Sequence, residues 1–339
     1  MSKTKTQGPV LADALAKAVP IAAMGREAWL AERRTGIGGT HAAAICGLSK
    51  WMTPFAAYVD LVEGHDDEEE SELLYWGSAL EAPILDRLSS DLGLQTVRGL
   101  FMRHPDRNWH IGSVDAVLLN KEFAPVAGAD AKNTNFFMRD DWGTADAPVV
   151  PSGYEGQGRW YLPLVNVEVW WFPVLIGGHQ FRKVAVHRDA ATEADMLTIV
   201  DDFRRKHLEP RIPPPIDGSE AARDHLRKRF AGHTEIVREA SVDEYPLIGN
   251  WQQARSALKA AEEQEALLKN QVIEAIGIDA GIKIGNEKIG LSRIAGRKTV
   301  DHKAVYAEAG VPQALIEKHT AQGAPSLRLN APRSWNKGE

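Results

Sequence analysis

Short runs of β-branched and aromatic residues, each bounded by glycine or polar turn residues, recur through the middle of the chain. Runs of this kind predict strands, because their side chains suit a half-buried pleated surface. They span residues 109–119, 165–172 and 179–187, and a further short strand is predicted over 126–132. Residues 190–209 instead repeat apolar positions at helical spacing, which predicts a helix.

From residue 211 onward the pattern is mainly helical. A proline-rich linker at 210–218 leads into helices, of which the longest spans 243–276. Its apolar positions alternate three and four residues apart, with Glu265 as the exception. That spacing is typical of a coiled-coil seam, or of an amphipathic helix packed on its own domain. The other elements predicted here are helices from 220 and over 301–318, a hairpin over 280–297 and a strand over 326–330.

These patterns predict three parts. Residues 1–24 form a flexible leader, residues 25–210 the main domain, and residues 211–339 an extension of helices and a β-hairpin. The extension carries several basic residues, so it is either a module that contacts DNA or a partner, or a packing appendage.

Composition places the chain among globular proteins. The 339 residues are 44% hydrophobic, which allows a sizeable core, and they carry a formal net charge of −6. That charge argues against general adhesion to nucleic acid, although local basic clusters can still contact phosphates. The sequence has no signal peptide, no apolar run long enough to cross a membrane and a single cysteine. We therefore expect a soluble cytoplasmic protein without a membrane partner.

Asp115 and the triplet Asp130-Ala131-Lys132 are the first candidates for chemistry. Asp115 is expected at the end of a strand, before further β-compatible residues, and alternation along the next strand puts Asp130 and Lys132 on one face. Carboxylates are hard oxygen ligands for Mg²⁺, which can polarise a phosphoryl oxygen and lower the pKa of a bound water. A nearby ammonium can stabilise the charge that develops at phosphorus. Because Asp-x-Lys also arises by chance, this interpretation needs support from other residues.

Two predicted helices carry polar residues that could complete such a site. Glu81 lies on a helix with an apolar side and could add a metal ligand; the alternative is an ordinary solvated glutamate. Gln157 and Tyr161 are four residues apart, so they share one helix face. That face could orient water or substrate, or it could simply be the buried face of an amphipathic helix.

A glycine-rich segment upstream is a candidate phosphate site. Arg33 and Arg34 precede the loop 36–39, and Thr40 is the expected N-cap of an alanine-rich helix. A helix N-terminus offers free N–H groups and a positive dipole end, and an arginine can add a bidentate contact. The segment lacks the lysine of a Walker loop, which argues against a nucleotide-binding protein. A helix cap without a ligand is the other interpretation.

Taken in order, these motifs resemble the YqaJ-type viral recombinase family, which is related to phage lambda exonuclease. The chain carries Arg-x-Gly-Ile-Gly-Gly-Thr, Gly-x-x-x-Glu, Ser-Val-Asp, Asp-x-Lys and Gln-x-x-x-Tyr, and the resemblance covers residues 25 to 230. The ordered set is far more specific than any single motif. It implies an α/β fold with a PD-(D/E)xK restriction-endonuclease-like core, in which helices flank a mixed central sheet, followed by the mainly helical extension.

The resemblance also implies a role for each motif residue. The metal, Mg²⁺ or Mn²⁺ in its place, would be held by Asp115, Asp130, the Ala131 backbone carbonyl and Glu81. The catalytic residues would be Lys132, Glu81, Gln157 and Tyr161. A terminal 5′-phosphate of DNA would be held by Arg33, Arg34 and Thr40.

Three positions depart from the family pattern. Val114 stands where the name-giving proline occurs, which is a common replacement. Asp130 stands where relatives usually carry glutamate, and its shorter side chain reaches less far toward a metal. His41 stands where aspartate is more usual.

The resemblance implies an Mg²⁺-dependent double-strand DNA exonuclease that digests from 5′ ends. Its 3′ single-stranded tails would serve phage-type homologous recombination by strand annealing. The implied partners are double-stranded DNA ends, a single-strand annealing protein and further copies of the chain in a ring-shaped trimer, inside a bacterial host cell. The alternatives are an endonuclease or repair nuclease of the same fold, and a non-catalytic protein that binds DNA ends and recruits other factors.

Overall fold

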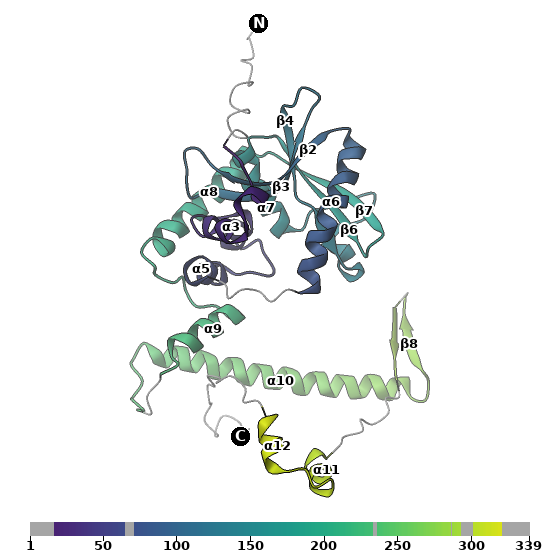
Figure 1. Cartoon of the computed structure of the whole chain (residues 1–339). Coiled ribbons are helices and arrows are strands. Elements are labelled where there is room, and N and C mark those ends of the chain that lie inside the picture. Colours follow the sequence, from purple (N-terminus) through teal and green to yellow (C-terminus); the bar gives the residue numbers. More distant parts are fainter. Residues whose placement is uncertain (1–16, 65–70, 233–235, 286, 293–300, 321–339) are drawn as a thin grey trace. The chain divides into compact units, whose positions relative to one another are not determined.

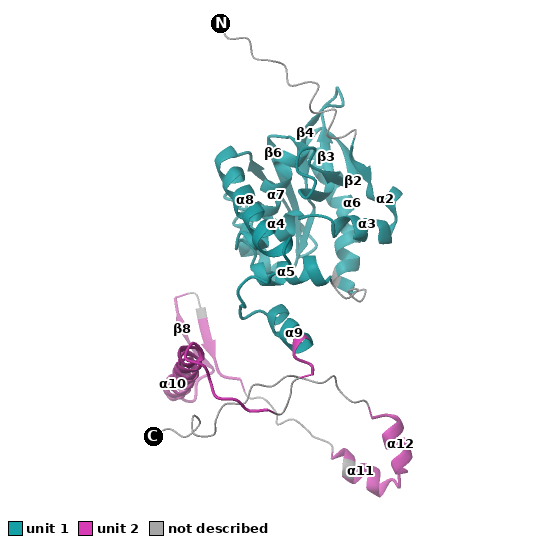
Figure 2. Ribbon diagram, turned by 90° about the vertical axis from the view of Figure 1, so that its left-hand side faces the viewer, with its two compact units in different colours: residues 1–228 teal, residues 229–339 magenta. Residues whose placement is uncertain are grey.

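The computed structural model describes residues 17–64, 71–232, 236–285, 287–292 and 301–320. Contacts within the chain divide it into two units, Met1–Lys228 and Arg229–Glu339, which Figure 2 shows in different colours. The expected boundary after residue 210 lies inside the first unit. The predicted division into residues 25–210 and 211–339 stays a prediction.

The described part of the first unit is built on a seven-stranded mixed sheet (Figure 1). The strands are β1 (Val19–Pro20), β2 (Gln95–Arg103), β3 (Ile111–Leu119), β4 (Pro125–Ala129), β5 (Lys132–Thr134), β6 (Val169–Ile176) and β7 (Gln180–His187). Their order is β1-β2-β3-β4-β6-β5, with β7 also paired to β6. Only β4 and β5 run parallel to β6; the other pairs are antiparallel.

The strand predicted over 126–132 is interrupted, so its predicted continuity is wrong. It is split into β4 and β5, with Asp130 and Ala131 between them. Both pieces keep the same register on β6, since Ala129 lies opposite Trp171 and Lys132 opposite Val174. The Asp130 amide still donates to the Trp171 carbonyl at 3.0 Å. The break therefore leaves Asp130 at a fixed position along β6.

Helices surround this sheet in the first unit. They are α2 (Ile21–Met24), α3 (Arg26–Arg33), α4 (Gly39–Ile45), α5 (Pro54–Glu63), α6 (Glu72–Leu92), α7 (Ser152–Val165), α8 (Ala190–Phe203) and α9 (Glu220–Arg229), whose last residue belongs to the second unit. A 3₁₀ segment, η1 (Phe136–Trp142), follows β5, and a π-helical segment, η2 (Arg204–Leu208), continues α8. The described end of the predicted leader contributes β1 and α2. The strand predicted from residue 165 begins at Val169, because α7 continues to Val165.

Local sequence signals set the ends of two of these helices. Thr53 caps α5 by accepting a hydrogen bond from the Ala56 amide, and Pro54 follows at the first helical position. Ser71 caps α6 in the same way, and α6 ends at Gly93 in the left-handed conformation, which glycine adopts without strain. These ends fix the position of the long helix that carries Glu81.

The sheet buries both of its faces. Ala116 and Leu118 of β3 form one cluster with Leu85 and Leu88 of α6. The larger cluster includes Val117 of β3 and residues of α4, α5, α7 and α8. Alternation along β3 explains the division, because successive side chains point to opposite faces. The expected mixed sheet flanked by helices is therefore confirmed.

The described part of the second unit is mainly helical, as expected. It contains α10 (Glu244–Ile276), the hairpin of β8 (Gly281–Ile284) and β9 (Glu287–Gly290), α11 (His302–Glu308) and α12 (Gln313–Lys318). The helix predicted over 301–318 is divided, and Gly310 between its parts has a positive φ of 61°. The strand predicted over 326–330 lies outside the described residues. None of the helices in the described ranges has the length and apolar character needed to cross a membrane.

Candidate active site

The carboxylates of Asp115 and Asp130 accept hydrogen bonds from backbone amides of each other's segments of the chain. Oδ2 of Asp115 accepts a hydrogen bond from the Ala131 amide at 2.9 Å. Oδ1 of Asp130 accepts one from the Asp115 amide at 3.4 Å. The pairing of β3 with β4 brings the two residues together, since Ala116 lies opposite Ala129. Each carboxylate is therefore oriented by a backbone amide of the segment that carries the other.

Lys132 lies beside this pair. Its Nζ is 3.9 Å from Oδ2 of Asp130 and donates a hydrogen bond to Oε1 of Gln157 at 3.2 Å. Asp130 is only 1% exposed, and its Oδ2 has no hydrogen-bond partner among the described residues. A buried carboxylate oxygen without a full complement of hydrogen bonds is costly unless a cation compensates it.

The electrostatics of the cluster favour an added positive charge. Burial raises the pKa of Asp115 well above 3.8, and the negative charge of Asp130 raises it further. Burial likewise raises the pKa of Asp130, against the opposing effect of Lys132. The pKa of Glu81 is raised by burial and by Asp130. The raised pKa values mean that the ionised forms of the three acids are disfavoured despite Lys132, and a bound divalent ion would stabilise those forms.

The donor set fits a hard divalent cation. Asp115 and Asp130 offer carboxylate oxygens, and Ala131, whose carbonyl is a further oxygen donor, directly follows Asp130 in sequence. Within the described ranges, however, no three His, Cys, Asp or Glu side chains converge as a metal-binding group. Mg²⁺ tolerates this because it keeps several waters and needs few carboxylates. The charge of Glu81 raises the pKa of Asp115, and its role as a further metal ligand stays a prediction.

Tyr161 connects this cluster to the glycine-rich loop. A Cβ added to Gly39 would lie 2.8 Å from Cζ of Tyr161, and one added to Gly112 would lie 2.7 Å from Cε1. Both glycines are therefore required for the ring to fit. Burial and the charge of Asp130 raise the pKa of the Tyr161 phenol, whereas Arg33 lowers it. The phenol is thus neutral and lies within electrostatic reach of both the acids and Arg33.

A cavity of about 140 Å³ opens beside Tyr161. Its lining includes Arg33, Thr40, Gln157 and Tyr161, together with Trp29 and residues of the loop and of β3. The guanidinium of Arg33 lies 4.7 Å from the centre of the Trp29 ring. The structure thus brings together two of the three predicted phosphate ligands with the Gln157/Tyr161 pair.

Arg34 lies apart from that cavity lining. Its guanidinium is directed toward Gly64 at the end of α5, where an added Cβ would lie 3.7 Å from Nη2. Thr40 lines the cavity, but α4 begins at Gly39, two residues earlier than a cap at Thr40 would give. The N-cap is therefore Gly38, and the prediction that Thr40 caps the helix is wrong.

His41 has a partner that the sequence did not reveal. Its Nε2 lies 2.6 Å from Oδ2 of Asp60 on α5, and the imidazole is only 9% exposed. The histidine therefore links α4 to α5. Nothing in the spacing of His41 and Asp60 along the chain predicted this pair.

Two aromatic residues near Lys132 were also missed. Its Nζ lies 4.8 Å from the centre of the Tyr154 ring and 5.7 Å from that of Phe172. Tyr154 precedes Gln157 by three residues on α7, a spacing that places both on one side of a helix. This spacing could have indicated from the sequence that Tyr154 lies near Gln157. Phe172 reaches the site through strand pairing, which leaves no such signal.

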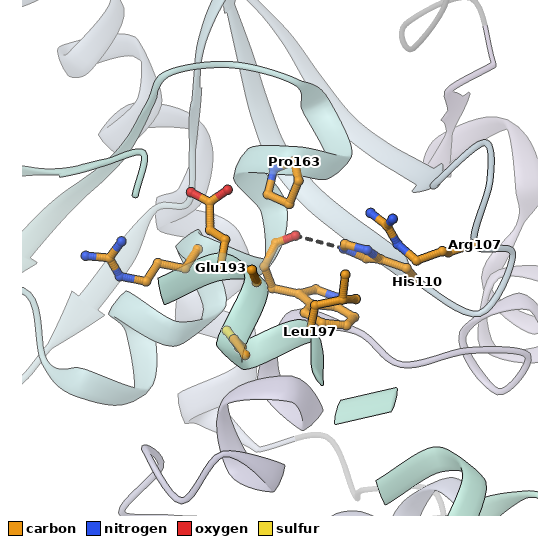
Figure 3. A pocket seen from close by; sticks show the side chains of 9 residues that line it. Arg107, His110, Pro163, Glu193 and Leu197 are labelled. Atoms are coloured by element: carbon orange, nitrogen blue, oxygen red, sulfur yellow. Dashed lines mark hydrogen bonds between the residues drawn. The ribbon is translucent and has the colours of Figure 1, made fainter. Parts of the chain in front are cut away.

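The other side of α7 lines a second cavity, of about 100 Å³ (Figure 3). There Nε2 of His110 donates to the Trp160 carbonyl at 2.9 Å, because a carbonyl can only accept. Burial lowers the pKa of His110 to about 3, so the imidazole is neutral at physiological pH. Arg107, Pro163, Glu193 and Leu197 also line this cavity. None of the predicted site residues is among its lining.

The fold and the site together define a class of protein. A mixed sheet flanked by helices carries, at adjoining strand positions, two aspartates and a lysine, with a glutamate on a neighbouring helix. This is the arrangement of the PD-(D/E)xK fold.

Comparison with known proteins finds a family whose model matches part of the chain. Residues 28–166 match the model of the YqaJ-like viral recombinase domain. Over 212 residues the chain is 32% identical to the protein YqaJ of Bacillus subtilis (strain 168). The aligned region covers 61% of this chain and 64% of the Bacillus protein. The expected resemblance to this family is therefore confirmed over residues 28–166, and the chain spans less than two thirds of the length of that relative.

Two solved structures show more distant similarity. The alkaline exonuclease LHK-Exo from Laribacter hongkongensis is 17% identical with a TM-score of 0.47, covering 62% of this chain and 100% of that one. A phage related exonuclease from Haemophilus somnus 129PT is 12% identical with a TM-score of 0.36, and the match covers 59% of this chain and 96% of that one.

Proposed function

We propose that the protein is an Mg²⁺-dependent exonuclease that digests double-stranded DNA from its 5′ ends. The observation that carries this proposal is the contact of Asp115, Asp130 and Lys132 around an incompletely hydrogen-bonded, buried carboxylate oxygen. The YqaJ-like viral recombinase domain supports it, because its matched residues include all three side chains.

Each residue would then have a distinct task. Asp115, Asp130 and the Ala131 carbonyl would hold the ion, which when bound supplies an activated water and polarises the scissile phosphate. The Lys132 ammonium would stabilise the negative charge that develops at phosphorus. Gln157 would hold that ammonium in place through the hydrogen bond already present. Glu81 would act as the auxiliary acid through its charge.

The cavity beside Tyr161 would set the polarity of digestion. Arg33 and Thr40 would bind the terminal 5′-phosphate, and Arg34 would reinforce the positive potential behind them. The products would be 3′ single-stranded tails, which a single-strand annealing protein would use in homologous recombination. A ring of three copies around the DNA, in the cytoplasm of a bacterial host, is part of the same proposal. Mn²⁺ would substitute for Mg²⁺.

Digestion of end-labelled linear duplex tests the proposal directly. We expect loss of the 5′ label first, dependence on Mg²⁺, inhibition by a chelator, and intact covalently closed circles. A 5′-hydroxyl end should be digested more slowly than a 5′-phosphate end. Closed circles that are cut would instead indicate an endonuclease of the same fold. Metal-independent binding to ends without any cleavage would indicate a non-catalytic recruiter.

A further inference from the structure

An aromatic path leads from Lys132 to the protein surface. The Lys132 ammonium lies 4.8 Å from the centre of the Tyr154 ring. The Tyr154 ring in turn lies 5.4 Å from that of Trp51, at an interplanar angle of 38°. Two short contacts therefore connect the lysine of the candidate active site to an indole that is 57% exposed.

The backbone around Trp51 is held firmly. Oγ of Ser49 accepts hydrogen bonds from the amides of Trp51 and Met52, both at 3.2 Å. The Ser152 hydroxyl at the start of α7 donates to the Leu48 carbonyl at 2.8 Å. The indole is thus presented on a loop that is fastened to the helix bearing Tyr154 and Gln157. An exposed aromatic ring on a fixed support has already lost the conformational freedom that ligand binding would otherwise remove.

Charge at this loop fits an anionic, aromatic ligand. Nζ of Lys50 lies 4.8 Å from the centre of the Trp51 ring and forms an ion pair with Asp141. A phosphate of a nucleic-acid strand could compete with Asp141 for this ammonium. A base can stack on an indole whatever its identity, because every base has a π-face.

We propose that Trp51, supported by Tyr154, stacks on an unpaired base of the strand whose phosphate lies at Lys132. The ligand is a single-stranded segment at the 5′ end of the substrate, so this inference rests on the proposed nuclease function. Stacking on Trp51 would stabilise the strand end in its unpaired form beside the metal ligands. Trp51 is accordingly a binding residue for the base, separate from the acids that act on the phosphate.

Base dependence of binding tests this inference. The full chain in EDTA is titrated with 5′-phosphorylated duplexes whose first nucleotides on the 5′-ended strand are either intact or abasic, and affinity is measured by fluorescence anisotropy. The unsubstituted protein should bind the intact end about tenfold more tightly than the abasic end, the effect expected of one stacked base. Trp51→Ala should remove this preference, and Trp51→Phe should keep most of it.

Phe123→Ala is the matched control. Phe123 is another exposed aromatic residue, 66% exposed, in the turn between β3 and β4. The Phe123→Ala protein should keep the full preference for intact ends over abasic ends. An equal penalty for abasic ends in the unsubstituted protein and in Trp51→Ala, or no binding of DNA ends at all, would overturn the inference. Parallel reactions in Mg²⁺ measure cleavage separately, so loss of the proposed nuclease function is recognised independently of base stacking.

Discussion

The two sides of α7 face groups of opposite chemical character. One side presents Gln157 and Tyr161 to the acids and to Lys132. The other presents Trp160 and Pro163 to the neutral His110. Burial favours the uncharged form in both places, since it raises the pKa of the acids and lowers that of the histidine.

The two sides differ in the groups that lie near the buried titratable residue. Around Asp130 the protein keeps a lysine and a carboxylate oxygen without a hydrogen bond, so additional positive charge is favourable there. Around His110 the neighbouring Arg107 and His104 oppose protonation, so additional positive charge is unfavourable. One helix thus separates a site that can accept a cation from a pocket that repels one.

The largest effect is expected from Lys132→Ala. Removal of the ammonium should lower the rate of DNA digestion by at least about 100-fold, because a positioned donor to the developing charge is lost. Circular dichroism should show an unchanged fold. Lys206→Ala is the matched control, since that lysine pairs with Asp202 on the surface segment that continues α8. Full activity in Lys132→Ala would remove the lysine from the proposed mechanism.

His110→Gln should change the pH dependence of stability on the other side of α7. Below pH 6.5 the unfolded chain binds a proton at residue 110 that the folded protein, with a pKa of about 3, does not bind. The free energy of unfolding should therefore fall as the pH is lowered from 6.5 toward 3. Between pH 7 and pH 5 the unsubstituted protein should lose about 2 kcal/mol more than His110→Gln.

Urea unfolding at the two pH values measures this difference. Glutamine can still donate to the Trp160 carbonyl, so the comparison mainly isolates the titration. Parallel profiles for the two proteins would contradict a neutral, buried His110.

A smaller effect is expected from Arg33→Ala. Loss of this guanidinium from the cavity beside Tyr161 should reduce the preference for 5′-phosphate over 5′-hydroxyl ends by about tenfold, which is typical of one charge-assisted contact. Arg34→Ala, whose side chain is directed toward Gly64, should reduce it less. Initial rates of digestion on 5′-phosphate and 5′-hydroxyl ends show which of the two substitutions reduces the preference more. The reverse ranking would show that Arg34 turns into the cavity when DNA binds.

The smallest effect on catalysis is expected from Leu197→Ala. This half-buried side chain lines the His110 pocket, so its truncation should lower stability by roughly 1–2 kcal/mol. Digestion rates should stay within about twofold of the unsubstituted protein. A large loss of activity would mean that the two sides of α7 are coupled.

The elements that carry strong local signals were predictable from the sequence. The strand at β3, the placing of Gln157 and Tyr161 on one helix face and the length of α10 all follow from local sequence patterns. The two aspartates and Lys132 were found through the order of their motifs. Their contact depends on the pairing of β3 with β4, which no local pattern specifies.

The features that escaped prediction depend on tertiary packing. The break between β4 and β5 has no glycine or proline at residues 130–131 to mark it. The choice between Arg33 and Arg34 depends on where α3 ends, because adjacent residues at a helix end point in different directions. His41 meets Asp60 only because α4 packs on α5. Local patterns do not encode side-chain direction at such boundaries.

The fit of Tyr161 against Gly39 and Gly112 has a consequence for the history of the family. A methyl group at either glycine would overlap the ring, whereas a smaller residue at 161 would leave a gap between the loop and the sheet. The three positions are therefore expected to change together or not at all across related sequences. A homologue that has lost this tyrosine should tolerate larger residues at both glycines, and it should bind its phosphate in another way.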